Sequence, residues 1–416
     1  MTAALPTWII CIAATAGVIT RPFRWPEAIW AVAGAVLLVA LGLLPIGSAL
    51  GAISKGTDVY LFLTGMMLLS EAARAEGLFD WVAATAVNHA RGSSIRLFML
   101  VYGAGVVVTT FLSNDATAVV LTPAVYAAAR KSGAEPLPLL FACALVANAA
   151  SFVLPISNPA NLVLYGGHMP PLKAWLGSFA LPSLAAITVT FVALRLVERK
   201  RLVGPCAPAV ERPVLGRGGW AALLGIVATA LVLIAMSALD RPLGLPTCLA
   251  GAATALGVSI MARRSPAKLV GAISWGVLPL VAGLFVLVEA LNRTGVVGWI
   301  AGALGRAARF GEPIAAAGAG TILAFGSNLI NNLPASLIAS TAIAQAHAPR
   351  LVVDGLLIGV DLGPNLSITG SLATILWLAA IRREGEDVSF LRFLKVGAAT
   401  MPPALLAAIG ARLLTS

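Results

Sequence analysis

Charged residues are scarce in this sequence: they make up 11% of its 416 residues, whereas 59% are hydrophobic. A soluble domain carries about 25% charged residues, so this composition argues against an ordinary soluble enzyme. Apolar runs of about 20 residues, long enough to cross a hydrocarbon core, recur along the whole chain. We expect spans near residues 5–21, 27–46, 58–74, 137–166, 173–196, 218–239, 246–262, 274–291, 351–381 and 393–414. No small-residue cleavage site follows the first span, so we expect it to remain in the mature protein.

Motifs for metal, nucleotide and disulfide chemistry are also missing. The four cysteines are scattered singly along the chain: Cys11, Cys143, Cys206 and Cys248. They form no CxxC pair and no Cys/His cluster, so neither a zinc site nor a disulfide framework is indicated. The three histidines form no HExxH motif and are expected in solvated loops or at span ends: His89, His168 and His347. Because no Walker A motif is present, we expect no cofactor, no metal and no use of ATP by the chain itself.

The net charge of +11 does not indicate a nucleic-acid partner, because the basic residues lie in short loops between apolar spans. This distribution is typical of the positive-inside pattern of membrane proteins. With ten spans and a cytoplasmic linker between residues 198 and 217, twenty of the 28 lysine and arginine residues fall on the linker side. The bias predicts a multi-pass protein of the plasma membrane with both termini outside the cytoplasm.

The second half of the sequence repeats the first. RPFRWP at 21–26 returns as RPLGLP at 241–246, and GAISKG at 51–56 returns as GAISWG at 271–276. A displacement of 218 residues then aligns five residues of the first half with five of the second: Gly65, Glu71, Trp81, Arg91 and Asn114 with Gly283, Glu289, Trp299, Arg309 and Asn332. The chain is therefore expected to consist of homologous halves, 1–197 and 218–416. Duplicated halves are typical of transporters whose substrate site lies between the repeats, near the bilayer midplane.

The spans and the repeat together predict an all-α polytopic membrane protein. We expect each half to hold five spans, one of them a broken helix (137–166 or 351–381), and one re-entrant hairpin (96–130 or 313–347). An odd number of spans makes the two halves inverted relative to each other. The segments 77–92 and 295–311 are predicted to be amphipathic interfacial helices. They are either a hinge collar around a moving unit or simple connectors.

Each half carries two polar interruptions of its apolar runs. These are LSNDAT (112–117), VLPISNPANL (153–162), LINNLPAS (329–336) and DLGPNLSITGS (361–371). Proline and glycine unwind a helix there, and irregular backbone at membrane depth is tolerated only where it is buried in protein or lines a cavity. An isolated break would more often be an ordinary kink, but four breaks paired across a duplicated chain predict a substrate site with two hairpin tips.

The charges in these breaks limit the kinds of substrate that the site can bind. They contain Asp115 and Asp361 but no lysine or arginine, which favours a neutral, hydroxyl-rich solute or a cation over an anion. Intramembrane carboxylates are functional candidates by default, so this pair suggests proton or cation coupling. The alternatives are an N-cap role for Asp115 and a structural hydrogen bond for Asp361. Glu71 and Glu289 lie at span ends, where a structural role is expected.

The motifs resemble the ion transporter superfamily and, within it, the ArsB-type arsenite efflux permeases. The resemblance covers nearly the whole chain through RPFRWPEAIWAVAGA, LSNDATAVVLTP, ISNPANLVLYG, NNLPASL and GPNLSITGSLATILWL. Related dicarboxylate carriers have Ser-Asn-Thr tips and Gly-Thr-Pro-Pro-Asn breaks, which this chain lacks. Asp115 stands in place of the Thr of that tip, which counts against a dicarboxylate substrate.

The resemblance implies a secondary carrier that extrudes arsenite, and antimonite with it, in exchange for protons. It also implies a bacterial or archaeal inner membrane and, in some members, a cytosolic arsenite-stimulated ATPase as partner. Arsenite near neutral pH is the uncharged triol As(OH)₃, which amide and hydroxyl groups can bind. Coordination by three thiolates would need three convergent cysteines, which the scattered positions do not indicate.

On this basis we expect a group of polar residues to line the substrate cavity: Ser113, Asn114, Asn158, Asn161, Asn332, Asn365 and Thr369. Asp115 and Asp361 are expected to be the proton-linked pair. A sodium/proton antiporter of the same superfamily, whose carboxylates would hold Na⁺, is the alternative. A channel or a membrane scaffold is a third possibility, but a scaffold has no need of broken helices around a midplane cavity.

Overall fold

The computed structural model describes residues 4–166 and 169–416, and the elements formed by these residues are helices. The first series is α1 (Ala4–Thr20), α2 (Glu27–Ala40), α3 (Ile46–Lys55), α4 (Thr57–Ala75), α5 (Leu78–Ala90), α6 (Ser94–Phe111), α7 (Asn114–Ala116), α8 (Thr122–Ser132), α9 (Pro136–Ala149), α10 (Pro159–Tyr165) and α11 (Leu172–Val197). The second series is α12 (Arg217–Ala238), α13 (Gly244–Met261), α14 (Pro266–Ala272), α15 (Val277–Arg293), α16 (Val296–Phe310), α17 (Glu312–Ile330), α18 (Asn332–Ala346), α19 (Arg350–Leu362), α20 (Leu372–Arg383) and α21 (Phe390–Leu414). The second series follows the order of the first, with the single helix α18 in the place of α7 and α8.

Six of the described helices are long and apolar enough to cross a membrane, or seven if α14 and α15, bent by 40°, form one span. Four of them, α11, α12, α13 and α21, coincide with predicted spans. The predicted spans at 137–166 and 351–381 are each divided by an irregular break into α9–α10 and α19–α20. The other two of the six helices, α6 and α17, are arms of the predicted hairpins. They are included because length and composition alone do not distinguish a hairpin arm from a span.

The two series are interlocked rather than side by side. Helix α4 of the first packs along α13 of the second, and α15 of the second packs along α2 of the first. Glycine allows both close approaches: an added Cβ would lie 2.2 Å from the Thr247 carbonyl oxygen at Gly65, and 2.8 Å from the Ala31 backbone at Gly283. Small residues bring membrane helices together in this way. The alignment of Gly65 with Gly283 in the repeat thus has a packing cause.

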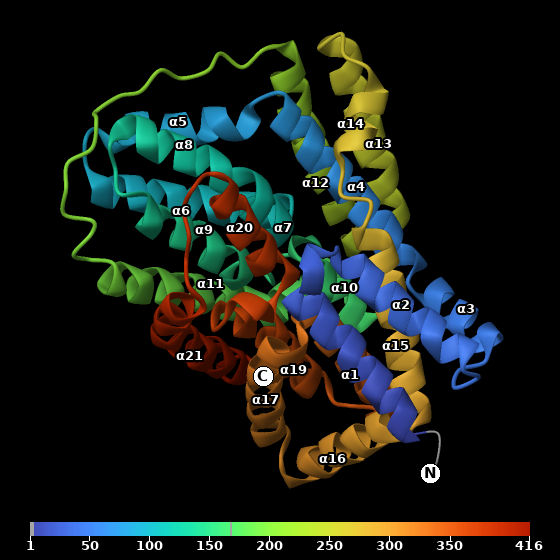
Figure 1. Cartoon of the computed structure of the whole chain (residues 1–416). Helices are drawn as coiled ribbons and strands as arrows, with labels where there is room; N and C mark the ends of the chain where they lie inside the picture. The colour runs from blue at the N-terminus through green and yellow to red at the C-terminus, as the bar shows by residue number, and fades with distance from the viewer. Residues whose placement is uncertain (1–3, 167–168) are drawn as a thin grey trace.

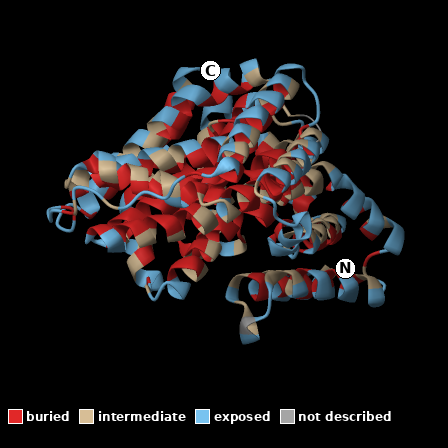
Figure 2. Cartoon of the chain, turned by 90° about the horizontal axis from the view of Figure 1, so that it is seen from above, coloured by how far each residue is buried: buried red, intermediate tan, exposed pale blue. Residues whose placement is uncertain are grey.

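The helices form two groups, which Figure 1 shows side by side. On one side lie α2–α4 and α12–α15, and on the other lie α6–α9, α11, α17 and α19–α21, with α1 and α10 between them. The amphipathic helices α5 and α16 lie at opposite ends of the molecule in this view. Figure 2 shows the buried residues in the middle of the bundle and the exposed ones around it. Large apolar side chains such as Leu231, Ile322 and Leu406 are exposed on the outside, as lipid contact requires.

The linker crosses the base of the first hairpin. The Cys206 amide donates to the Gly92 carbonyl at 3.1 Å, just before α6, and the Ala207 amide donates to the Ser132 carbonyl at 2.7 Å, at the end of α8. Both ends of the α6–α8 segment therefore lie together on the linker side, as a re-entrant hairpin requires. The Val210 amide adds a bond of 2.7 Å to the side chain of Asn88 in α5.

We propose that the two series are the duplicated halves, 1–197 and 218–416. The matching order of the elements, from α1 and α12 to α11 and α21, supports this division. The glycines that precede the amphipathic helices support it as well. Gly77 before α5 and Gly295 before α16 are aligned by the repeat, and both adopt left-handed backbone conformations with φ of 70° and 86°.

Candidate functional site

Residues of three breaks, together with the helix start that follows the fourth break, line one narrow cavity, which we call the tip cavity. In the first hairpin, α6 ends at Phe111 and a new helix begins at Asn114; in the second, α17 ends at Ile330 and α18 begins at Asn332. The lining comes from both hairpin tips, from the starts of α10 and α20, and from α4 and α15: Leu63, Asn114, Asp115, Asn158, Pro159, Val277, Asn332, Leu333, Leu372 and Ala373. Four of the predicted site residues, Asn114, Asp115, Asn158 and Asn332, are thus brought together.

Several polar atoms at the tip cavity have no protein partner. The Asn114 Oδ1 atom has one partner, the Asp115 amide, from which it accepts at 2.9 Å. Among the described residues, the carboxylate of Asp115 has neither a hydrogen-bond donor nor a cation beside it. The buried Oδ1 atom of Asn332 is also unpaired. Buried polar atoms are rarely left without partners, so this arrangement suits a small polar solute.

Asn158 connects the tip cavity to a fully buried carboxyl group. Its Nδ2 atom donates to Oδ1 of Asp361 at 2.9 Å, and its Oδ1 atom accepts from the Ala160 amide at 3.0 Å. Asp361 has an exposed fraction of 0%, and its second oxygen, Oδ2, is unpaired. A carboxyl group inside the membrane with one free oxygen and no cation partner is a candidate for carrying a proton.

A second polar pair mirrors this one across the two halves. Asn148, in α9, donates to Oδ1 of Asn365, in the second break, at 3.0 Å. The Nδ2 atom of Asn365 donates in turn to the Leu145 carbonyl at 3.0 Å. Both asparagines have an exposed fraction of 0%, and neither lines the tip cavity. The sequence motifs did not single out Asn148. Its only distinguishing feature in the sequence is that it is a polar residue within the apolar run before the break at 153–162.

Three further predicted residues, Ser113, Asn161 and Thr369, stabilise the breaks instead of facing the tip cavity. The hydroxyl of Ser113 accepts from the Ala116 amide at 3.2 Å and caps the hairpin-tip helix. The Nδ2 atom of Asn161 donates to the Ser151 carbonyl at 2.9 Å and so closes the irregular backbone of its own break.

Two asparagines that the sequence motifs did not single out, Asn328 and Asn331, lie where the second hairpin (313–347) contacts the break at 361–371. Asn328 donates to the Gly363 carbonyl at 3.0 Å and accepts from the Ser367 amide at 3.1 Å. The Thr369 hydroxyl donates to the Asn328 carbonyl at 2.8 Å. Asn331, at the tip itself, has φ of 74° and ψ of 153°, a conformation that only glycine adopts without strain. In the sequence, Asn331 was recognisable only as the first of the two adjacent asparagines of LINNLPAS.

The remaining acidic and histidine candidates lie away from the tip cavity. Glu71 pairs with Arg74 at 2.6 Å, and Glu289 pairs with Lys55 at 3.3 Å. Both pairs are structural contacts near helix ends. His89 is hydrogen-bonded to a backbone carbonyl in its own helix, His347 terminates α18, and His168 lies outside the described residues.

The cysteines do not converge. Cys11 lies in α1, Cys143 in α9, Cys206 in the linker and Cys248 in α13, and all four are free thiols. Within the part of the chain that the structure describes, no three His, Cys, Asp or Glu side chains are placed to hold a metal ion.

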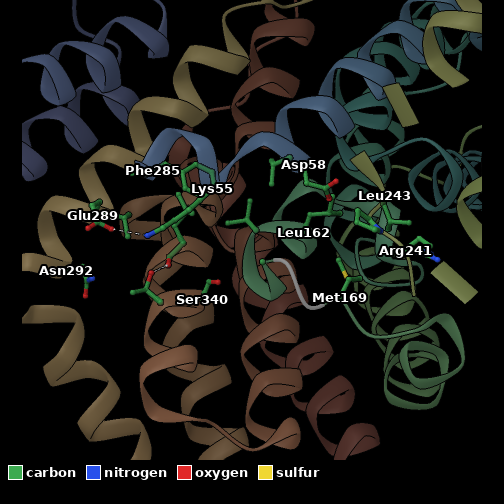
Figure 3. A pocket seen from close by; sticks show the side chains of 18 of the residues that line it. Lys55, Asp58, Leu162, Met169, Arg241, Leu243, Phe285, Glu289, Asn292 and Ser340 are labelled. Carbon is green, nitrogen blue, oxygen red and sulfur yellow. Dashed lines mark hydrogen bonds and ion pairs between the residues drawn. The ribbon is translucent and has the colours of Figure 1, made fainter. Parts of the chain in front are cut away.

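Figure 3 shows a wider cavity of about 430 Å³, which we call the vestibule. It is lined by residues of α3, α4, α10, α15 and α18 and by the loop between α12 and α13. Charged side chains of both signs face it: Lys55, Asp58, Asp240, Arg241 and Glu289. Figure 3 shows Lys55 turned toward Glu289, its ion-pair partner.

Comparisons with known proteins agree with the membrane architecture. Residues 11–378 match the family described as "CitMHS: Citrate transporter". The chain is 28% identical over 370 residues to the arsenical pump membrane protein of Escherichia coli (strain K12), covering 84% of this chain and 85% of that protein. A second arsenical pump membrane protein of Escherichia coli is 27% identical over 403 residues, covering 91% and 92%.

A solved structure shows the fold. The YdaH transporter of Alcanivorax borkumensis aligns with a TM-score of 0.56 and 18% identity, covering 88% of this chain and 86% of that one. The fold class predicted from the sequence is thereby confirmed, as is the resemblance to transporters that include arsenical pumps.

Proposed function

Because this chain belongs to the CitMHS citrate-transporter family, we propose that it is a secondary transporter, and that it exports arsenite in exchange for protons. One observation carries the choice of substrate: the lining of the tip cavity holds amides and a carboxylate but no lysine or arginine. An anion such as citrate would face the unpaired carboxylate of Asp115 without a cation to balance it. The uncharged triol As(OH)₃ meets donors and acceptors instead, and the relatives named as arsenical pumps support this substrate. Antimonite has the same chemistry.

The coupling proton would be carried by Asp115 and Asp361. Asp115 faces the tip cavity without a partner, and Asp361 is joined to that cavity through Asn158. A proton bound at either carboxyl group changes the charge next to the substrate. Binding of the substrate and of the proton would then be linked, as exchange requires.

The direction of transport follows from the expected orientation. We propose that the linker lies in the cytoplasm of a bacterial or archaeal cell, with both termini outside its inner membrane, because twenty of the 28 basic residues fall on the linker side. The linker face is also where a cytosolic ATPase subunit would dock, if the chain works with one.

The function is tested by expressing the chain in cells that lack their own arsenite exporter and in cells that lack sodium/proton antiporters. We expect the chain to restore growth on arsenite and to leave sodium sensitivity unchanged, because its tip cavity suits a neutral triol. Restored growth on high sodium alone would favour the antiporter, with the carboxylate of Asp115 binding Na⁺. Restoration of neither would contradict both.

Arsenite export should not depend on thiols. A chain with Cys11, Cys143, Cys206 and Cys248 all changed to Ser should protect cells from arsenite as well as the unchanged chain does, because these side chains lie on separate elements. The measurement is growth against arsenite concentration at matched membrane expression. Complete loss of protection at normal expression would show that arsenic is bound by sulfur and not by hydroxyl-recognising amides.

A further inference from the structure

The vestibule opens on the side of the molecule away from the linker. Helix α4 starts at the vestibule, where Asp58 and Val59 line the wall. At its other end, the Glu76 carbonyl oxygen would lie 3.4 Å from a Cβ added to Gly219, in the first turn of α12, directly after the linker. A solute leaving through the vestibule would therefore leave on the face opposite to the linker.

The tip cavity and the vestibule share four helices; their linings are about two turns apart on α15, at Val277 and Phe285, and about one turn apart on the other three. On α4, Val59 lines the vestibule and Leu63 lines the tip cavity; on α18, Leu337 lines the vestibule and Leu333 the tip cavity. On α10, Leu162 lines the vestibule four residues after Asn158. Four residues of helix span about 6 Å, so the layer between the cavities is thin.

This layer is apolar and buried. It consists of four leucines with exposed fractions between 3% and 7%, which we call the leucine barrier: Leu63, Leu162, Leu333 and Leu337. The described residues that line the vestibule and those that line the tip cavity form two sets without a common member. Charged groups of both signs thus line the vestibule side of the barrier, whereas the tip-cavity side has the carboxylate of Asp115 and no lysine or arginine.

We propose that the leucine barrier determines the substrate class of the transporter, because it lets uncharged hydroxylated solutes pass between tip cavity and vestibule and excludes ions. This inference rests on the proposed function and specifies the neutral form of the substrate as the one that is carried. An ion at the barrier loses its water and meets no polar group in exchange, which costs far more than moving a neutral hydroxyl group. Apolar constrictions exclude ions by dewetting in the same way.

The barrier also explains how an unpaired carboxylate can persist in the tip cavity. The vestibule is lined by charged side chains of both signs, and the leucines separate ions in it from Asp115. The free carboxylate then remains available to a neutral solute.

The test measures which reagents reach a thiol placed behind the barrier. In a chain with the four natural cysteines changed to Ser, Ala373→Cys places the thiol in the tip cavity and Ser340→Cys places it in the vestibule as a control. Neutral methyl methanethiosulfonate and its trimethylammonium-ethyl and sulfonatoethyl analogues are added to the vestibule side of sealed vesicles. We expect all three reagents to modify the vestibule thiol at similar rates. The two charged reagents should modify the tip-cavity thiol at least about tenfold more slowly than the neutral one.

Opening the barrier should remove this difference. Adding Leu63→Ser, or Leu333→Ser if the first variant does not reach the membrane, should raise the charged-reagent rates toward the neutral one. The matched control is Leu69→Ser, because Leu69 is a buried leucine of α4 outside both linings. This change should leave the modification rates of the charged reagents low. Equal rates for charged and neutral reagents with the barrier intact would overturn the proposal, as would an unchanged ratio in the serine variants. No arsenite is used, so failure of arsenite transport and failure of the barrier are separate results.

Discussion

Replacing Asp361 by Asn should abolish arsenite accumulation driven by a proton gradient while arsenite binding persists. The substitution keeps the size of the side chain and an oxygen that can accept from Asn158, at the position where Oδ1 now accepts at 2.9 Å. It removes the group that can bind a proton. Because the carboxyl group is fully buried and its Oδ2 atom has no partner, no neighbouring side chain can take over its proton.

The measurement uses everted membrane vesicles in which uptake corresponds to export from the cell. Arsenite uptake is compared with and without an imposed proton gradient for the unchanged chain, Asp115→Asn and Asp361→Asn. Uptake by Asp361→Asn should fall to the level seen without a gradient, whereas equilibrium binding of arsenite should change less than about threefold. Asp115→Asn should weaken the gradient response too, because its carboxylate faces the tip cavity.

A matched control is available on the same helix. Asp354 has the same exposed fraction of 0%, but its oxygens are held by Arg350 at 2.7 Å, Arg412 at 2.9 Å and the Tyr165 hydroxyl at 2.7 Å. Because the oxygens of Asp354 are held by two arginines and a tyrosine, we do not expect this carboxylate to take part in proton transfer. Asp354→Asn should therefore lower the amount of folded protein and leave the gradient response per molecule unchanged. Full gradient-driven uptake by both Asp115→Asn and Asp361→Asn would show that neither residue is the coupling site.

The convergence of Asn114, Asp115, Asn158 and Asn332 on one cavity was predictable because the breaks are polar residues within apolar runs. Asn114, Asp115, Asn158 and Asn332 all come from such breaks and line one cavity. The repeat predicted that the breaks would meet, since aligned halves place equivalent tips on opposite sides of one centre.

The different hydrogen-bond partners of the asparagines were not predictable from their spacing in the sequence. Asn158 and Asn161 are three residues apart at the start of α10, yet one donates to Asp361, 203 residues away, and the other donates to the backbone of its own break. Sequence position shows that a residue belongs to a break but not where its side chain points. Asn148 was missed for a related reason, because its partner lies in the other half of the chain.

Asn365→Ala should therefore destabilise the folded chain strongly instead of weakening arsenite binding directly. The alanine leaves the Nδ2 atom of Asn148 and the Leu145 carbonyl without the partners they now have at 3.0 Å. Each buried polar group left unpaired costs about 1–3 kcal/mol. We expect a clear fall in the apparent melting temperature of the purified protein in detergent. Asn114→Ala, which opens onto the tip cavity, should lower arsenite affinity several-fold with little change in melting temperature.

A double-mutant cycle separates this explanation from a general loss of packing. If Asn148 and Asn365 stabilise the fold mainly through each other, Asn148→Ala combined with Asn365→Ala should cost less than the sum of the single changes, by about 0.5–3 kcal/mol. The second alanine then removes a side chain that the first had already left unpaired. Additive effects would mean that the two amides act separately. A large loss of arsenite affinity in Asn365→Ala at an unchanged melting temperature would place Asn365 in the substrate cavity, as its position in the second break predicted, and the hydrogen bond to Asn148 would then have to open when arsenite binds.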